Sequence, residues 1–117
     1  MYTYVITLDR VIDGDTIDAM IDLGFDVHVK KRIRFMGINT PESRTRDLEE
    51  KKLGLAAKAR VQELLTTCSY ITLKSHGSGK FGRCLGELFI EIENEAVNLN
   101  QLLISEGHAV AYFGGKR

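Results

Sequence analysis

The sequence predicts an α+β protein, mainly β, in which five short strands and two helices build one domain. Three observations predict this class. Apolar and polar residues alternate through most of the first 38 residues, which is typical of strands, and apolar residues at helical spacing follow from about Leu48 to Thr66. Two further alternating segments and a second helical segment complete the pattern. The length of 117 residues fits one domain with a single modest core.

The composition is that of an ordinary globular chain, with 44% hydrophobic and 27% charged residues. Sixteen basic and sixteen acidic side chains cancel, so any attraction for phosphate must be local. The two cysteines, Cys68 and Cys84, are too few for a disulfide framework, and we interpret them as reduced thiols. No signal segment and no apolar run of membrane-spanning length is present. We expect a cytoplasmic protein without membrane contact, or a secreted one whose leader has been removed.

The first three strands follow from alternation and from one turn. Strand one covers about residues 2–12. Asp13 and Gly14 form a strong turn signal, since Gly accepts positive φ and Asp bonds to the nearby backbone. Strand two runs over residues 17–23 after this tight turn. Alternation resumes over residues 25–38 and predicts strand three.

The second half of the chain supplies two more strands and the second helix. Residues 71–73 and 85–90 read as strands four and five around a glycine-containing hairpin loop at 75–79. A helix is predicted over residues 97–106, before an extended segment at 109–113. Three strands, a helix, two strands and a helix is the element order of an OB-type Greek-key barrel, a fold that often binds oligonucleotides.

Residues able to carry chemistry gather where strand three ends. Pro41 is the only proline of the chain, and it fixes its own φ and pushes Thr40 toward extended conformations. Glu42 is therefore held at a stiff corner. An acid on a rigid corner suits a functional site. The alternative is an ordinary turn with a solvated Glu.

A second group of oxygen atoms lies in residues 13–16, Asp-Gly-Asp-Thr, at the first turn. Hard cations such as Ca²⁺ select carboxylate and carbonyl oxygens. By itself this tetrapeptide is explained more simply as a structural turn. If strand three lies beside strand one, however, Asn39, Thr40 and Glu42 bring further oxygen donors to the same place.

Two arginines suit recognition of phosphate. The guanidinium groups of Arg34 and Arg83 can each bind a phosphate through two parallel hydrogen bonds. Each could instead serve structure alone, Arg34 by pairing with Asp15 and Arg83 by pairing with Glu42. The basic run at residues 30–32 could guide a phosphate backbone, although a solvated strand face explains it more simply.

Four segments together resemble the staphylococcal nuclease (thermonuclease) family. They occur in the order of that family, cover most of the chain, and are residues 11–16, Arg34 with residues 37–42, residues 81–83, and residues 107–112. The resemblance implies a nuclease-like OB-type domain over residues 1–113, with residues 114–117 as a C-terminal tail. We expect a monomer.

The resemblance implies a Ca²⁺-dependent phosphodiesterase that acts on DNA and RNA and leaves 3′-phosphate ends. Tyr112 could contact substrate, as its counterpart in the family does, or simply cap the barrel. The implied metal ligands are Asp15, Asn39 and the backbone carbonyl of Thr40, the implied catalytic residues are Arg34, Glu42 and Arg83, and the implied substrate-binding residues are Lys80, Phe81 and Tyr112.

The chain departs from the family pattern at three places. Asn39 replaces a carboxylate, so a metal site should lose affinity. Phe81 stands where the family often has Tyr, and a phenyl ring cannot donate that hydrogen bond to phosphate. The chain ends soon after Tyr112, so we expect the family's further C-terminal helix to be missing. Asn39 favours one alternative function, a non-catalytic nucleic-acid or protein-binding module of the same fold.

Overall fold

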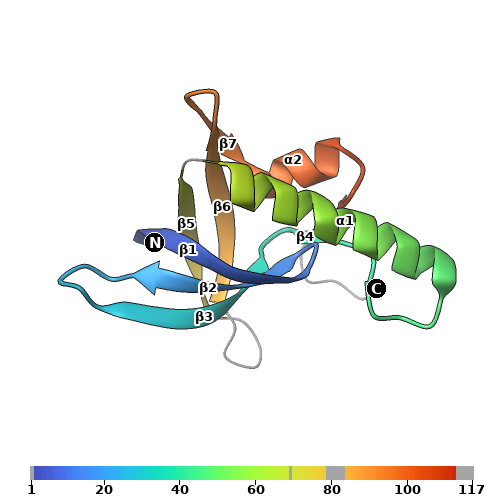
Figure 1. Cartoon of the computed structure of the whole chain (residues 1–117), viewed down its shortest axis with the longest axis horizontal. Helices are drawn as coiled ribbons and strands as arrows, with labels where there is room; N and C mark the ends of the chain where they lie inside the picture. The colour runs from blue at the N-terminus through green and yellow to red at the C-terminus, as the bar shows by residue number, and fades with distance from the viewer. Residues whose placement is uncertain (1, 69, 79–83, 113–117) are drawn as a thin grey trace.

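The computed structural model describes residues 2–68, 70–78 and 84–112, which form a curled β-sheet with two helices beside it (Figure 1). A large sheet contains six strands, and a small sheet pairs two short ones. In chain order the elements are β1 (Tyr2–Asp13), β2 (Thr16–Asp22), β3 (His28–Phe35), β4 (Ile38–Asn39), α1 (Leu48–Thr67), β5 (Ile71–Ser78), β6 (Cys84–Ile92), β7 (Glu95–Asn98), α2 (Leu99–Ser105) and β8 (Val110–Ala111).

The large sheet closes into a barrel because β3 pairs along both of its edges. It is antiparallel to β2, with Ile33 opposite Ile17, and parallel to β6, with Ile33 beside Cys84 and Phe35 beside Gly86. The strands β1, β2, β3, β5 and β6 therefore form a closed ring, which removes free sheet edges. β7 continues the sheet beyond β6. The predicted five-stranded OB-type barrel with two helices is confirmed.

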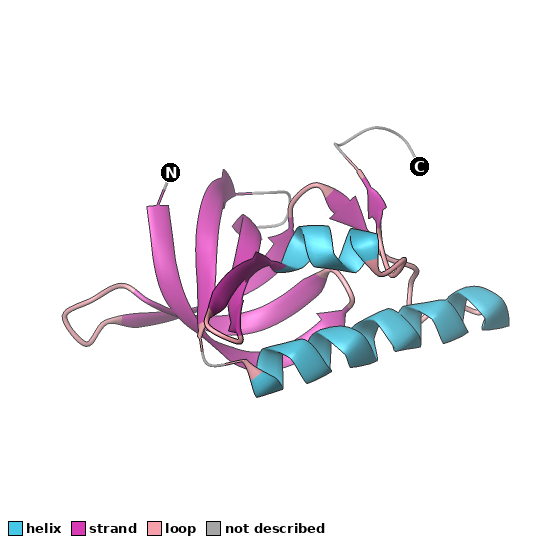
Figure 2. Cartoon of the chain, turned by 90° about the horizontal axis from the view of Figure 1, so that it is seen from above, coloured by secondary structure: helices cyan, strands magenta, loops and turns pink. Residues whose placement is uncertain are grey.

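The barrel and the helices share one core. Figure 2 shows both helices beside the barrel. Side chains that point inward along the strands alternate with outward polar ones, which is the pattern that predicted the strands. The fully buried members of the core, each 0% exposed, include Ile17, Ile33, Leu73 and Leu88 of the barrel, Val61 of α1, and Leu99 and Leu103 of α2.

Helix α1 confirms the predicted first helix and extends it by one residue. Asp47 caps its start, since the Asp47 carboxylate accepts hydrogen bonds from the backbone amides of Glu49 at 3.0 Å and Glu50 at 3.2 Å. Its buried residues recur at helical spacing and are Gly54, Ala57, Val61, Leu64 and Leu65. Neither described helix combines the length and the apolar character needed to cross a membrane.

Strand three begins later and ends earlier than predicted. Residues 24–27 form a tight turn closed by the Val27 amide on the Gly24 carbonyl at 2.9 Å, with positive φ at Phe25 and Asp26. Phe25 continues the alternating pattern but is fully exposed, so alternation was misleading there. A second turn at Gly37, with φ of +82°, separates β3 from β4. That turn redirects the chain toward the candidate site.

The predictions for the second half need two more corrections. The helix expected from Val97 begins at Leu99, because residues 95–98 pair with β6 as β7 and Asn98 then caps α2 by accepting from the Gln101 amide at 3.1 Å. The loop expected at 75–79 is largely strand, since β5 runs to Ser78. A bulge there accommodates Gly77, whose φ is +104°.

Asn100, 1% exposed, ties α2 to the barrel through backbone groups of two separate segments. The Asn100 side-chain amide donates to the Met36 carbonyl at 2.8 Å and to the Gly86 carbonyl at 3.3 Å, and its oxygen accepts from the Leu88 amide at 3.3 Å. Buried backbone groups without partners cost free energy. Asn100 therefore holds the turn after β3 against β6.

Replacing Asn100 by Ala should lower the free energy of unfolding by about 2–4 kcal/mol, because three buried backbone groups each lose a hydrogen bond. Urea unfolding followed by far-ultraviolet circular dichroism measures the change. The matched control is Gln101→Ala at the neighbouring exposed position of α2, which should stay within about 0.5 kcal/mol of the wild type. Equal midpoints for the two variants would contradict the structural role of Asn100.

Candidate active site

The candidate site forms where β1 turns into β2, next to the end of β3. Asp15 lies in that turn, and its backbone carbonyl accepts a hydrogen bond of 2.8 Å from the Phe35 amide. Arg34 of β3 lies opposite Thr16 of β2. After the next turn, β4 brings Asn39 to the same place. The topology therefore brings together Asp15, Arg34 and Asn39, which are up to 24 positions apart in the chain.

The Asp15 carboxylate is nearly buried and has several partners. Its Oδ1 accepts from the Thr16 hydroxyl at 3.0 Å, and its Oδ2 accepts from the Thr40 backbone amide at 3.1 Å. Oδ2 also lies 3.6 Å from Nη1 of Arg34, with the Asp15 side chain 13% exposed. These contacts fix the orientation of the carboxylate and join the first turn to the residue that precedes Pro41.

The Arg34 guanidinium connects the acid to the amide at position 39. Nη1 donates to the Phe35 carbonyl at 2.8 Å, and Nη2 donates to Oδ1 of Asn39. The Arg34 side chain is 15% exposed. The ion pair with Asp15 that the sequence left open is therefore present. The same contact places a guanidinium fork beside two of the predicted metal ligands, Asp15 and Asn39.

Helix α1 packs closely against the segment after β4 and against the turn after β1, and a glycine lies at each of these two contacts. A Cβ on Gly54 would lie 2.4 Å from the carbonyl oxygen of Glu42, which is much shorter than van der Waals contact. A Cβ on Gly14 would lie 2.7 Å from Cβ of Ala57 and 3.0 Å from Cγ2 of Thr40. Only glycine fits at either position, so α1 sets the place of the segment that carries Thr40 and Glu42.

Sequence reasoning missed Gly54 and Ser43. Ser43 is 2% exposed, and its hydroxyl hydrogen-bonds the carboxylate of Asp13, thirty positions earlier in the chain. Asp13 thereby fixes the residue that follows Glu42. A glycine inside an otherwise strong helix was a signal that could have revealed Gly54. Nothing local marks Ser43, whose partner is brought close only by the folded barrel.

Glu42 and Tyr112 flank the cluster, whereas three predicted residues cannot be placed. Glu42 is exposed and lines the same hollow as Asp15 and Arg34. Tyr112 is half-buried, and its amide donates to the Gly37 carbonyl at 2.8 Å, beside the pairing of β8 with β4. The residues predicted in the β5–β6 connection lie outside the described residues, so their roles stay predictions: Lys80, Phe81 and Arg83.

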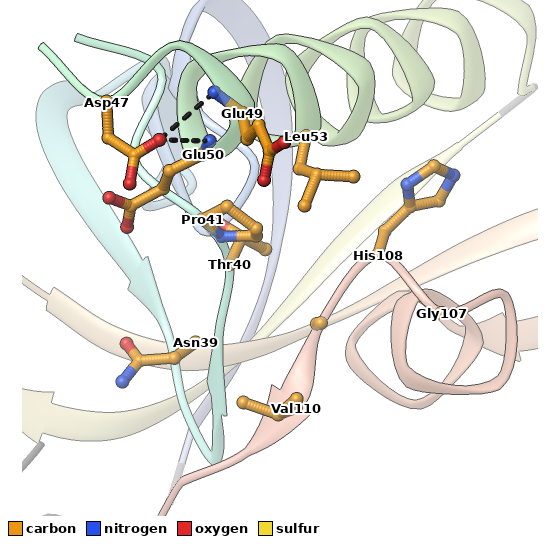
Figure 3. A pocket seen from close by; sticks show the side chains of 11 residues that line it. Asn39, Thr40, Pro41, Asp47, Glu49, Glu50, Leu53, Gly107, His108 and Val110 are labelled. Atoms are coloured by element: carbon orange, nitrogen blue, oxygen red, sulfur yellow. Dashed lines mark hydrogen bonds between the residues drawn. The ribbon is translucent and has the colours of Figure 1, made fainter. Parts of the chain in front are cut away.

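Two hollows adjoin each other because they share Asn39, Thr40 and Pro41 as lining residues. The smaller one, which we name the site hollow, has a volume of about 190 Å³ and is further lined by Asp13, Asp15, Thr16, Arg34 and Glu42. The larger one, about 400 Å³, lies between the start of α1 and residues 107–110 (Figure 3). Its additional lining residues include Glu49, Glu50, Leu53 and His108. Asp15, Arg34 and Glu42 do not line it, so of the two hollows only the site hollow brings all three predicted metal ligands together.

An ion pair joins α1 to the end of α2, next to residues 107–110 that line the larger hollow. Nε and Nη2 of Arg60 donate to the two carboxylate oxygens of Glu106 at 2.7 and 2.8 Å. The hydrogen bonds from Arg60 lower the pKa of Glu106 below its ordinary value. The chain then runs to β8, where Val110 lies opposite Asn39. The Arg60 contact therefore ties α1 to the end of α2, just before the segment that leads to β8.

The site hollow is lined by residues whose oxygen donors are of the chemical type that a hard cation such as Ca²⁺ prefers. Asp15 offers a carboxylate, Asn39 an amide oxygen and Thr40 its backbone carbonyl. Thr40 also has a buried hydroxyl, Oγ1, without a hydrogen-bond partner in the described part of the chain. Among the described residues, no group of three or more His, Cys, Asp or Glu side chains could hold a metal. Of the three implied ligands only Asp15 carries a carboxylate, so a cation held by them would otherwise depend on neutral oxygens and water, which predicts low affinity.

Fold and site together define a class of protein, an OB-type barrel with a polar site at the adjoining ends of its first strands. A model of the family described as staphylococcal nuclease homologue matches residues 32–117. This match covers more than half of the chain, and the chain belongs to that family. The resemblance seen in the sequence is confirmed.

Two relatives cover nearly the whole chain. Over 113 residues the chain is 33% identical to Endonuclease YhcR of Bacillus subtilis (strain 168), a match that covers 91% of this chain and 9% of that protein. Over 108 residues it is 27% identical to Protein ParB of Escherichia coli, with 88% of this chain and 54% of that protein covered. The chain spans less than two thirds of the length of either relative.

Gly54→Ala should destabilise the fold by about 1–3 kcal/mol, because the added methyl group would overlap the Glu42 carbonyl. Helix propensity alone predicts the opposite sign, a gain of about 1 kcal/mol. Urea unfolding decides between them. Ala56→Gly at the neighbouring exposed position is the matched control and should cost about 1 kcal/mol through propensity alone. Stabilisation by Gly54→Ala would refute the close approach of α1.

Proposed function

We propose that the chain is a metal-dependent nuclease that hydrolyses phosphodiester bonds of DNA, RNA or both. The observation that carries the proposal is the site hollow, in which Asp15, Arg34, Asn39, Thr40 and Glu42 line one space of about 190 Å³. Membership of the staphylococcal nuclease homologue family supports it, as does the endonuclease relative. We further propose Ca²⁺ as the metal, a monomer as the active form and 3′-phosphate ends as products.

Arg34 has the chemistry to bind the phosphate that is cleaved. Its fork carries parallel donors that match phosphate oxygens, and its low exposure strengthens the electrostatic attraction. A phosphate that takes these donors releases the oxygens of Asp15 and Asn39 that Arg34 now contacts. Arg83 would add a second guanidinium. Fixed positive charges of this kind stabilise negative charge that develops on the phosphoryl oxygens in the transition state.

Glu42 is the proposed general base. It is exposed and lines the site hollow, so water has access to its carboxylate. Glu42 accepts the proton of a water molecule that attacks phosphorus, the bond from phosphorus to the 5′ oxygen breaks, and the phosphate stays on the 3′ end. The departing 5′ oxygen keeps the bonding electron pair and takes a proton from solvent water to become a hydroxyl. The rigid corner at Pro41 and the contact with Gly54 hold the backbone of Glu42 in place.

Asp15, Asn39 and Thr40 would hold the metal. A bound Ca²⁺ would polarise the phosphoryl oxygen and offset its negative charge. Asn39 contributes oxygen without a formal charge, so this chain provides less attraction for a cation than a pair of carboxylates would. That deficit supports the second candidate function, a nucleic-acid or protein-binding module that has lost catalysis. The two candidates differ in the effect of Ca²⁺: it should support cleavage by a nuclease, whereas a binding module should not cleave at any Ca²⁺ concentration.

Glu42→Gln should lower the rate of cleavage of labelled single-stranded DNA by about 10²- to 10⁴-fold, because the amide cannot accept the water's proton. The assay compares saturating Ca²⁺ with excess EDTA, and EDTA should stop cleavage by the wild type. The matched control is Glu49→Gln, an exposed acid of α1 outside the site hollow, which should cleave like the wild type. Equal rates for Glu42→Gln and the wild type would exclude Glu42 as the base.

Asn39→Asp should shift half-maximal cleavage to a Ca²⁺ concentration lower by roughly tenfold, because it restores a negative charge to the ligand set. A Ca²⁺ titration of the cleavage rate measures the shift. If the wild type fails to cleave at any Ca²⁺ concentration and Asn39→Asp cleaves, the binding module is the natural function. If neither protein cleaves, the assignment of the site hollow as a nuclease site is wrong.

A further inference from the structure

Two arginines share one buried carboxylate on the outer face of the barrel, beyond the site hollow. Nε of Arg10 donates to Oδ2 of Asp18 at 3.1 Å. Nε and Nη2 of Arg32 donate to the two oxygens of the same carboxylate at 2.9 and 3.2 Å. We name these three residues the arginine cluster. They come from three adjacent strands, β1, β2 and β3.

The strand register places the arginine cluster next to the site hollow. Arg34 lies opposite Thr16, and Arg32 lies opposite Asp18, one alternation further along the same two strands. Residues two apart on a strand point to the same face at a spacing of about 6.6 Å. Arg32 and Arg34 are therefore neighbours on one face, separated by a distance of the order of one nucleotide step in an extended strand.

The exposure of the three side chains leaves positive charge facing solvent. The side chains of Arg10 and Arg32 are 64% and 44% exposed, whereas that of Asp18 is 9% exposed. The hydrogen bond from Arg32, helped by Arg10, lowers the pKa of Asp18 to about 2, so this carboxylate stays ionised at neutral pH. Two guanidinium charges against one carboxylate give the cluster a net charge of +1.

Asp18 orients the guanidinium groups of the cluster but accepts hydrogen bonds from only some of their N–H donors. The hydrogen bonds to Asp18 use Nε of Arg10 and both Nε and Nη2 of Arg32. Within the described part of the chain, Nη1 of Arg32 and both Nη groups of Arg10 are not used in these bonds and can donate to a phosphate. The next cation outward, Lys30, is instead matched by one acid, Asp9, at 2.8 Å. The ion pair offsets the charge of Lys30, whereas the cluster keeps an excess of one positive charge on this face of β3.

We propose that the arginine cluster binds the phosphate adjacent to the one held by Arg34, so that a single-stranded polynucleotide extends from the site hollow along β3. This inference rests on the proposed function, because Arg34 marks the phosphate that is cleaved. Asp18 acts as a positioning residue that keeps both forks directed outward and rigid. A preorganised fork loses less side-chain freedom on binding phosphate than a flexible lysine does.

The test is binding of a fluorescently labelled oligodeoxynucleotide of about 12 nucleotides, followed by anisotropy in EDTA over a series of salt concentrations. EDTA prevents cleavage, so binding is measured apart from catalysis. Arg10→Gln and Arg32→Gln should each weaken binding severalfold. Each should also reduce the slope of log affinity against log salt by about 0.7, the value for one phosphate contact on a single strand.

Three comparisons complete the experiment. Lys52→Gln removes one positive charge from an exposed position of α1 and should leave both affinity and slope unchanged. Arg32→Lys keeps the charge and should keep the slope. A labelled dinucleotide, which has one internucleotide phosphate, should bind the wild type and Arg10→Gln equally. Thermal unfolding of every variant confirms that the binding data come from folded protein.

Two results would overturn the arginine cluster as a phosphate site. One is that Arg10→Gln and Arg32→Gln bind the longer oligonucleotide like Lys52→Gln. The other is that the wild type binds it no better than the dinucleotide. Cleavage with Ca²⁺ is measured separately on the same proteins. Cleavage without an effect of the cluster variants refutes the inference alone, whereas binding that depends on the cluster without any cleavage refutes only the nuclease proposal.

Discussion

The contact of Arg34 with Asp15 and Asn39 is the interaction on which the site depends. It joins the turn after β1, the end of β3 and the strand β4 through one guanidinium of low exposure. A charge in such a position needs partners, and the loss of one partner would leave the others unpaired. The same arrangement presents an acid, an amide oxygen and a cation to one hollow. It therefore serves the fold and offers the chemistry of phosphate and metal binding.

Packing outside the barrel keeps this contact in register. Asn100 holds the turn that follows β3, the absence of a side chain at Gly54 lets α1 reach the Glu42 backbone, and the ion pair of Arg60 with Glu106 supports the path to β8. The site hollow is lined by none of Asn100, Gly54, Arg60 and Glu106. Each acts on backbone position, so their variants should alter stability and site geometry together.

Local patterns predicted the barrel and singled out most residues that line the site hollow, because both are recognisable in short segments of the sequence. Alternation revealed the strands, and residues 13–16 and 34–42 carry their oxygen donors and arginine within a few positions. The turn at Phe25 was missed because an exposed aromatic residue fitted the alternation, and β7 was missed because four residues resemble the start of a helix. Asn100 and Ser43 could not be predicted, since their partners are distant in sequence.

The central claim is that the cluster of Asp15, Arg34 and Asn39 is a functional metal and phosphate site and not merely an internal ion pair of the barrel. Isothermal titration of Ca²⁺ into the protein tests it most directly. We predict one weak site that is lost in Asp15→Asn and retained in Asp22→Asn, a control at the exposed end of β2. Binding of Ca²⁺ that is unchanged in folded Asp15→Asn, or absent from the wild type, would contradict the claim.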